Sequence, residues 1–419
     1  MRPVEIPNLA VPSISPAPRG ARRAPILTGL LLVGLTLGAC GDSTADTSSG
    51  QPKEEYDAEQ RALQGPSDDN TALAFGEGEL FSIDAAPDGT VYAADQDAQV
   101  FRITPEGAAT LVAGTGDFRP DNLDEWAADN EFDGTPGVEA TLLDPVAVRV
   151  GPDGTVFLLE VSATVSRVLA LAPDGSLSVL ATSTPDDEEA EFPNLGPCQM
   201  GVGPGGEVFL IDCDANTVRR LDPTTGEITK VVEIDPDDER FQNSASYAVS
   251  ISPTGEIYLS GGDWVAKANS DGTITHLAGS GEPIDGTDGA ENDDPACEDA
   301  AAATEMALGT VGSIVVEDDG SLIVSGGDSD ENLGCIWRIA PDGSATVLLD
   351  LSVPLDVAIA GQEATIEIDG WPYDLGQSAD GTIFAAIGDT SHTVGVPEYH
   401  HILRIPVTGD VEAIAVQDL

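Results

Sequence analysis

The chain has 419 residues, of which 17 are Lys or Arg and 74 are Asp or Glu, so its formal net charge is −57. Such a negative field repels phosphate groups, which excludes nucleic-acid binding and membrane attachment through a basic patch. A hydrophobic content of 41% with 46 Gly and 29 Pro still permits a packed core and is typical of a turn-rich all-β protein.

An uncharged apolar run near the start of the chain indicates an export signal. Ile26–Ala39 follows the basic pair Arg22-Arg23 and is too short to span a bilayer of about 30 Å as a helix. It ends in Leu37-Gly38-Ala39-Cys40, which resembles the bacterial lipobox. The resemblance implies that residues 1–39 are a lipoprotein signal peptide and that the Cys40 thiol is acylated. An ordinary secretory signal followed by a chance cysteine is the alternative, and the export route stays open.

The segment after the lipobox is polar. Residues from Gly41 to about Phe75 are rich in Ser, Thr, Asp, Glu and Gln and show almost no apolar periodicity. Such a segment buries too little apolar surface to offset the entropy lost on ordering. We therefore predict a disordered tether over residues 40–75, which carries lipid at its first residue and holds the protein at the outer face of a bacterial cell membrane.

Four further cysteines predict two disulfides in an exported chain. The hairpin centred on Pro204-Gly205-Gly206 would place Cys198 opposite Cys213, within disulfide reach. Cys297 and Cys335 would then form the second pair. A metal site is the alternative, but no Cys-x-x-Cys spacing supports it.

From residue 76 onward one pattern recurs six times. Each copy has an apolar strand, a turn of the Pro-Asp-Gly type, a second strand, a third strand with a basic residue, and a fourth strand. The turns are Pro87-Asp88-Gly89, Pro152-Asp153-Gly154, Pro204-Gly205-Gly206, Pro253-Thr254-Gly255, Asp318-Asp319-Gly320 and Asp380-Gly381. The basic residues are Arg102, Arg167, the pair Arg219-Arg220, Lys267, Arg338 and Arg404. We expect each to pack its stem and pair with a carboxylate of the neighbouring blade.

Six such copies predict an all-β, six-bladed β-propeller of four-stranded antiparallel blades over residues 76–419, because stacking the sheets around an axis buries faces that none can bury alone. Val91-Tyr92-Ala93-Ala94-Asp95 and Leu111–Gly116 resemble NHL-repeat propellers, and so does Leu277–Gly281. The resemblance covers residues 76–419. It implies the fold but specifies activity poorly, because this propeller serves many functions.

Two families of propeller enzymes provide an alternative function. Gly76-Glu77-Gly78 resembles the opening of the senescence-marker/gluconolactonase family, whose channel holds a divalent cation on Glu, Asn and Asp, but no partner Asn or Asp matches. Propeller lyases use His-rich channels, whereas we expect His276 on an outer strand and His400-His401 on a third strand. No catalytic residue is therefore assigned, and Ca²⁺ is a possible cofactor of a lactonase-like hydrolase or lyase. Other acidic candidates for Ca²⁺, or for solvated surface charge alone, are Asp288, Glu291, Asp293 and Asp294.

Two long insertions predict a binding face. Residues 115–142 and 280–308 each connect an outer strand to the next inner strand, so they share one face of the ring. The candidate binding residues on this face are Trp126, Trp371, Tyr373 and Asp374, and the alternative is that Trp371 and Tyr373 are core residues. We therefore predict a monomeric, membrane-anchored binding module for a protein or glycan partner. The alternatives are the Ca²⁺-dependent enzyme and a structural envelope protein.

Overall fold

The computed structural model describes residues 80–116, 132, 134–161, 165–183, 197–212, 216–235, 248–280, 297–328, 333–359, 362–366, 370–388, 400–408 and 410–416. All of them belong to the compact unit Ser67–Leu419. The expected signal peptide, Cys40 and the tether lie outside the described residues. Within the described ranges, no helix is both long and apolar enough to cross a membrane.

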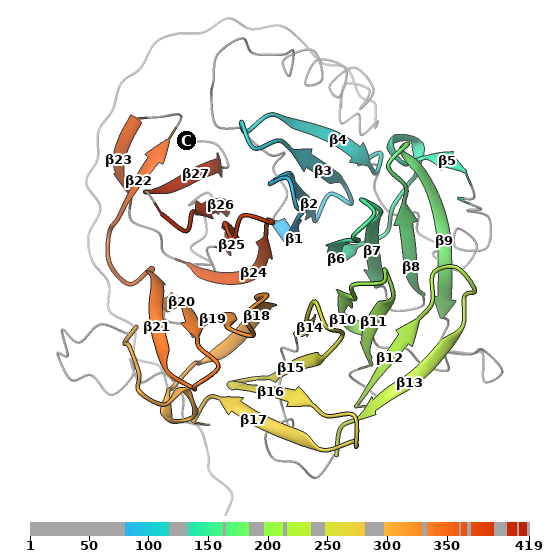
Figure 1. Ribbon diagram of the computed structural model, residues 1–419. Coiled ribbons are helices and arrows are strands. Elements are labelled where there is room, and N and C mark those ends of the chain that lie inside the picture. The colour runs from blue at the N-terminus through green and yellow to red at the C-terminus, as the bar shows by residue number, and fades with distance from the viewer. Residues whose placement is uncertain are drawn as a thin grey trace, which may run out of the picture. The chain divides into compact units, whose positions relative to one another are not determined.

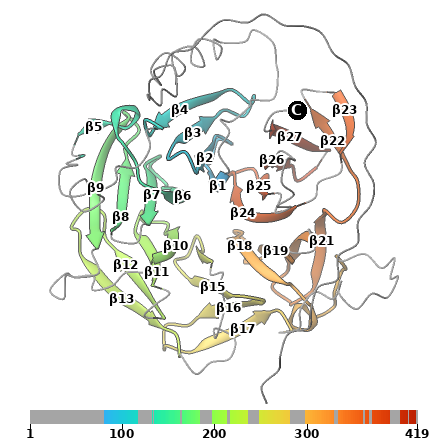
Figure 2. The ribbon, with the colours of Figure 1, turned by 180° about the vertical axis from the view of Figure 1, so that it is seen from behind.

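Six antiparallel sheets are arranged as a ring in this unit, each running from an inner strand beside the axis to an outer strand at the rim (Figures 1 and 2). The inner strands are β1 (Leu80–Ala85), β6 (Pro145–Val150), β10 (Pro197–Val202), β14 (Val249–Ile251), β18 (Thr310–Val316) and β24 (Trp371–Gln377). The second strands are β2 (Val91–Asp95), β7 (Val156–Val161), β11 (Val208–Asp212), β15 (Ile257–Gly261), β19 (Leu322–Asp328) and β25 (Ile383–Gly388).

Third and outer strands complete each blade in chain order. The third strands are β3 (Val100–Ile103), β8 (Ser166–Leu171), β12 (Thr217–Leu221), β16 (Trp264–Ala268), β20 (Leu333–Ile339) and β26 (His400–Ile405). The outer strands are β4 (Ala109–Ala113), β9 (Ser176–Ser183), β13 (Ile228–Glu233), β17 (Ile274–Ala278), β21 (Ala345–Asp350) and β27 (Val411–Val416). The predicted six-bladed propeller is confirmed.

The expected tight turns form one face of the ring. In blade 1, Asp88 Oδ1 accepts a hydrogen bond from the Thr90 backbone N–H at 2.9 Å, and Gly89 has a φ of 85°, which favours glycine. Similar turns join the first to the second strand in every blade and the third to the fourth strand in blades 1 to 5, and we call this side the tight-turn face. Because the strands alternate in direction, the second and fourth strands end on the opposite side, where the third strands and the next inner strands begin; we call that side the long-connection face.

The described ends of the two long insertions seal gaps between blades. In the first, η1 (Gly137–Glu139) joins blade 1 to blade 2, since Gly137 O accepts from Gly114 N at 3.0 Å and Gly137 N donates to Gly175 O at 2.8 Å. In the second, η2 (Ala303–Glu305) joins blades 4 and 5 in the same way, with bonds from Gly279 N to Ala303 O and from Ala303 N to Gly343 O. We call residues 134–144 and 297–309 the straps; β5 (Thr135–Pro136) lies in the first and pairs with β9.

Both straps also bury apolar side chains between blades. Ala140 and Leu142 of the first strap join a core cluster with residues of blades 1 and 2, as does Phe132 just before it. Met306 and Leu308 of the second strap do the same between blades 4 and 5. The insertions were expected to contribute to a binding face, but their described ends contribute to the core instead.

In the part of the chain that the structure describes, the first and last blades share no strand. Blade 1 consists of β1–β4, and blade 6 contains β24–β27, so side-chain packing and single bonds such as the one from Ala379 N to Pro87 O form the seam between them. Ile83 of blade 1 packs in one cluster with Phe384 and Ile402 of blade 6. Gly376 permits this close approach, because a Cβ at that position would lie 2.6 Å from the Ala85 backbone nitrogen.

An additional hairpin covers the outer edge of blade 6. β22 (Leu355–Ile359) pairs with β23 (Gln362–Ile366) in antiparallel fashion and with β27 in parallel, so the final sheet has six strands. The connection from blade 5 to blade 6 thereby pairs with an edge strand that would otherwise present free backbone groups.

Truncation of a strap side chain tests the sealing role. Leu308 is fully buried between blades 4 and 5, so Leu308→Ala should leave a cavity and lower the free energy of unfolding by about 2–5 kcal/mol, measured by urea denaturation. Val407→Ala is the control, because Val407 is 69% exposed. A Leu308 variant as stable as this control would show that the strap is not part of the core.

Candidate functional site

A repeated irregularity in the inner strands directs side chains towards one another. In five of them the register with the second strand shifts near the strand's start, as at a β-bulge. Bulges change the direction of nearby side chains and are frequent beside functional sites. The residues directly after the shifts are Ser82, Ala147, Gln199, Ser313 and Asp374. Three of these, Ser82, Ser313 and Asp374, form hydrogen bonds with one another across blades.

Asp374 lies at the centre of this group and is 2% exposed. Each of its carboxylate oxygens accepts three hydrogen bonds. The donors to Oδ2 are Ser82 Oγ (2.6 Å), Ile83 N (3.1 Å) and Arg149 Nη1 (2.9 Å), and those to Oδ1 are Ser313 Oγ (3.0 Å), Leu375 N (3.0 Å) and Arg149 Nη2 (3.2 Å). The carboxylate of blade 6 is therefore bound to groups of blades 1, 2 and 5.

Arg149 supplies the positive charge. Its guanidinium forms a bidentate ion pair with Asp374, the strongest geometry for this pair of groups. It also donates to the carbonyl oxygens of Val148 and Ile83, at 2.7 and 3.3 Å, and to Gln199 Oε1 at 3.3 Å. The side chain is 11% exposed, so almost all of its charge is satisfied within the protein.

A second carboxylate belongs to the same group. Asp84 of β1 accepts hydrogen bonds from Val150 N at 2.7 Å and Ala85 N at 2.8 Å. Burial raises the pKa of Asp84 to about 6, although the nearby Arg149 opposes the shift. Burial also acts to lower the pKa of Arg149, but Asp374 and Asp84 outweigh it and leave that pKa raised. We call this group the axial cluster; its members are Ser82, Asp84, Arg149, Gln199, Ser313 and Asp374.

The axial cluster does not fit a Ca²⁺ ion. Calcium takes six to eight oxygen ligands, whereas the lone pairs of Asp374 are already occupied by its six donors. The Arg149 guanidinium also provides the charge compensation that a metal ion would supply. The ion pair between Asp374 and Arg149 and its hydrogen bonds therefore connect blades 1, 2, 5 and 6, and we call this pair the clasp. The acidic segment around Asp288, the other expected source of Ca²⁺ ligands, lies outside the described residues.

Sequence reasoning placed Asp374 on the binding face and overlooked Asp84 and Arg149. The available signal was a charged residue inside an apolar inner strand, as in the segment Pro145-Val146-Ala147-Val148-Arg149-Val150. Trp371 and Tyr373 are half-buried, with ring centroids 6.5 Å apart, and Tyr373 packs against the seam between blades 1 and 6. Trp126 lies outside the described residues. His276 and His401 lie on outer and third strands, as expected.

In blades 2 to 6 a recurring basic residue forms an ion pair with a carboxylate of its own blade, so the expectation of pairing with a neighbouring blade is wrong there. A third strand is adjacent to its own second and outer strands at about 4.8 Å, whereas packed sheets lie about 10 Å apart. The pairs are Arg167–Glu160, Arg219–Asp212, Lys267–Glu256, Arg338–Glu317 and Arg404–Glu412. Arg167 and Arg219 also differ in register: Arg167 lies next to the start of β8, and Arg219 precedes the penultimate Arg220 of β12. Arg102 and Arg404 are themselves the penultimate residues of their strands.

Second strands of the first three blades carry a buried carboxylate at or next to their last residue, and the partners of these carboxylates differ. Glu160 pairs with Arg167 at 2.7 Å, and Asp212 pairs with Arg219 at 3.5 Å. Asp95 has no such cation: its Oδ1 accepts from Gln99 N at 2.9 Å, and its Oδ2 accepts no hydrogen bond from the described residues. Burial raises the pKa of Asp95 to about 7, which means that the ionised form of this carboxyl group destabilises the folded protein.

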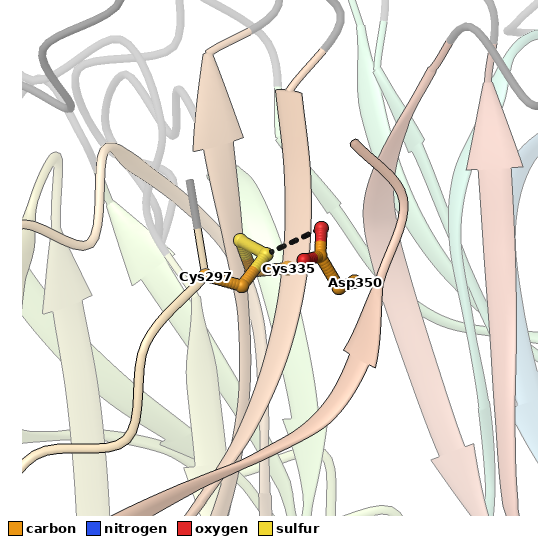
Figure 3. A group of neighbouring side chains, drawn as sticks. All are labelled: Cys297, Cys335 and Asp350. Carbon is orange, nitrogen blue, oxygen red and sulfur yellow. Dashed lines mark hydrogen bonds between the residues drawn. A yellow bond between two sulfur atoms is a disulfide. The ribbon is translucent and has the colours of Figure 1, made fainter. Parts of the chain in front are cut away.

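One predicted cysteine pair is brought together. The sulfurs of Cys297 and Cys335 lie within bonding distance, with Cα atoms 5.8 Å apart, and Asp350 Oδ1 lies 3.1 Å from Cys297 Sγ (Figure 3). The three side chains could hold a metal ion only with both thiols reduced, since a disulfide uses both sulfurs. The Cys198–Cys213 pair stays a prediction, because Cys213 and the Cys198 side chain lie outside the described residues.

Comparisons with known proteins concern the fold alone. No protein-family profile matches the chain, and no curated protein matches it. Virginiamycin B lyase from Staphylococcus aureus is 13% identical over 83% of this chain and 88% of that chain, with a TM-score of 0.44. An auxiliary nutrient binding protein from Bacteroides ovatus is 13% identical over 80% and 72%, with a TM-score of 0.46. Regucalcin, a calcium-binding protein from Agrobacterium tumefaciens, is 11% identical over 84% and 94%, with a TM-score of 0.43.

Removal of the central carboxylate charge tests the clasp. Asp374→Asn should lower the free energy of unfolding by about 3–5 kcal/mol, because Arg149 would remain buried without its counter-ion. Arg149→Met in the same chain should recover part of this loss, since it removes the unpaired charge. Urea denaturation of the two single variants and the double variant measures the coupling. Strictly additive losses would contradict the clasp.

The unpaired carboxylate predicts a stabilising substitution with a defined pH dependence. Since the folded-state pKa of Asp95 is about 7 and lies above its unfolded value, the folded state binds more protons between about pH 4 and 7, and stability falls as pH rises through that window. Asp95→Asn should therefore stabilise the protein by about 3 kcal/mol at pH 8 and by little at pH 4. Thermal unfolding at both pH values measures this.

Asp212→Asn is the matched control for that experiment. Asp212 occupies the equivalent position in blade 3 but pairs with Arg219, so its substitution should destabilise the protein at pH 8. A stabilisation by Asp95→Asn that is the same at both pH values would contradict a buried titrating carboxylate at position 95.

Proposed function

We propose that the protein is a lipid-anchored, extracytoplasmic propeller that binds a protein or glycan partner through its long-connection face. The observation that carries this proposal is the state of the axial cluster. Asp374 is saturated with hydrogen bonds and Arg149 is paired with it, so the groups at the axis hold blades together. A hydrolase or lyase site at the axis would need groups that remain available to a substrate or a metal ion.

The unequal faces of the ring support partner binding on one of them. Connections on the tight-turn face are short hydrogen-bonded turns, such as the one in which Gly89 N bonds to Ala86 O. On the other face, Ser183 of β9 and Pro197 of β10 are the ends of a much longer connection. Variable connections on a rigid scaffold are where binding residues concentrate. Trp371, at the start of β24, provides a half-buried aromatic ring on this face, of the kind that anchors interfaces.

The lipid anchor depends on one thiol. Cys40→Ala should remove both acylation and signal cleavage, so the protein should lose labelling by an alkyne analogue of palmitate and run as the longer precursor. Gel electrophoresis of labelled cells measures both properties. Ser43→Ala, three residues away, should behave as the wild type. Equal labelling of the two variants would contradict acylation at Cys40.

The position of the partner can be tested in living cells. A photo-crosslinking amino acid in place of Trp371 should give discrete adducts on irradiation, whereas the same amino acid in place of Thr254, exposed in the tight turn of blade 4, should give few. Gel electrophoresis with protein and glycan staining distinguishes the partner classes. Adducts of equal yield from both positions would contradict binding on the long-connection face.

A further inference from the structure

A cavity of about 340 Å³ lies off the axis, on the tight-turn face at the seam between blades 1 and 6. Two first-to-second-strand turns form its walls, and the Ala379 backbone N–H joins them by donating to Pro87 O at 3.0 Å. No residue of the axial cluster lines it. The cavity is therefore separate from the clasp and lies on the face opposite the proposed partner surface. We call it the seam cavity.

Two carboxylates line the seam cavity. Asp88 Oδ1 accepts from Thr90 N at 2.9 Å, and Asp380 Oδ1 accepts from Thr382 N at 3.1 Å. These bonds and those from neighbouring hydroxyls hold the pKa of both carboxyl groups below the usual range, with the backbone bond the main cause for Asp88 and the Ser378 hydroxyl for Asp380. Both side chains are exposed, so they present permanent negative charge to a ligand.

The remaining lining provides apolar walls and little net positive charge. Pro87, Pro105 and Phe384 line the cavity, and because Phe384 is only 1% exposed, the prolines provide most of the apolar surface. Arg404 also lines it; its Nη1 pairs with Glu412 Oε2 at 2.8 Å, and its charge helps to lower the pKa of Asp380, as that of Arg102 does for Asp88. The seam cavity therefore combines an apolar surface with an excess of negative charge.

We propose that the seam cavity binds an alkylammonium group on an apolar stem, as carried by a lysine side chain or a free diamine. The stem would contact Pro87 and Pro105, while the ammonium would lie between Asp88 and Asp380. The volume falls in the range of small-ligand sites, about 300–1,000 Å³. A bare divalent cation fits less well, because it needs six or more converging oxygen ligands, and the apolar walls supply none.

A pair of probes isolates the charge from the stem. Nα-acetyl-lysine methylamide should bind the full chain saturably in the millimolar range, at least about tenfold tighter than Nα-acetyl-norleucine methylamide, which has an apolar stem without the ammonium. Saturation-transfer NMR in 0.5 M NaCl measures both, because that salt screens non-specific attraction to so acidic a protein. Cadaverine, tested in parallel, distinguishes a free diamine from a peptide lysine as the source.

Matched variants locate the site. Asp88→Asn with Asp380→Asn keeps the turn-closing oxygen of each residue but removes the charge, so lysine-probe affinity should fall at least about tenfold while the melting temperature is maintained. Asp153→Asn with Asp342→Asn is the control, because these residues close equivalent turns elsewhere through Thr155 N and Ser344 N. Equal affinity for both probes, equal loss in the two double variants, or no saturable binding would overturn the proposal.

Discussion

The carboxylate of Asp374 is the constraint on which the ring depends. It accepts hydrogen bonds from Ser82 and Ile83 of the first blade and from Ser313 of the fifth, and it pairs with Arg149 of the second. Because the first and last blades share no strand among the described residues, this buried polar junction and the apolar seam beside it hold the two blades together. Desolvating a buried ion pair costs free energy. When all of its hydrogen bonds and charges are paired, however, the pair favours the single blade arrangement in which these contacts form.

The blades could be predicted from sequence because their signals are local. Apolar runs and turns such as Pro87-Asp88-Gly89 lie within one hairpin, where residue chemistry determines conformation directly. The axial cluster could not be assembled in this way, because Arg149 and Asp374 are 225 residues apart. The contact between these two side chains depends on blade order and on small register shifts in the inner strands. Neither can be predicted from the residue types alone. The off-register position of Arg167 was overlooked for a related reason, since an arginine in a third strand looks the same in either register.

The straps show a second limit of sequence reasoning. A long polar insertion between blades resembles a surface loop, and here the described ends of two such insertions contribute to the core. Gly137 illustrates the physical reason: a Cβ there would lie 2.5 Å from Val112 O, so only glycine permits this approach to the preceding blade. Such a close contact between segments is visible only once both blades are in place. A net charge of −57 is therefore compatible with close packing between neighbouring blades.

The order of the blades also bears on how the chain reaches its final state during synthesis. Arg149 leaves the ribosome 225 residues before Asp374, which at about 5–20 residues per second is a delay of roughly 10–45 s. During that interval the first two blades lack the counter-ion that their arginine requires, and the first blade lacks its apolar neighbour. A nascent chain therefore lacks this junction between blades 1, 2, 5 and 6 until the inner strand of blade 6 has been synthesised.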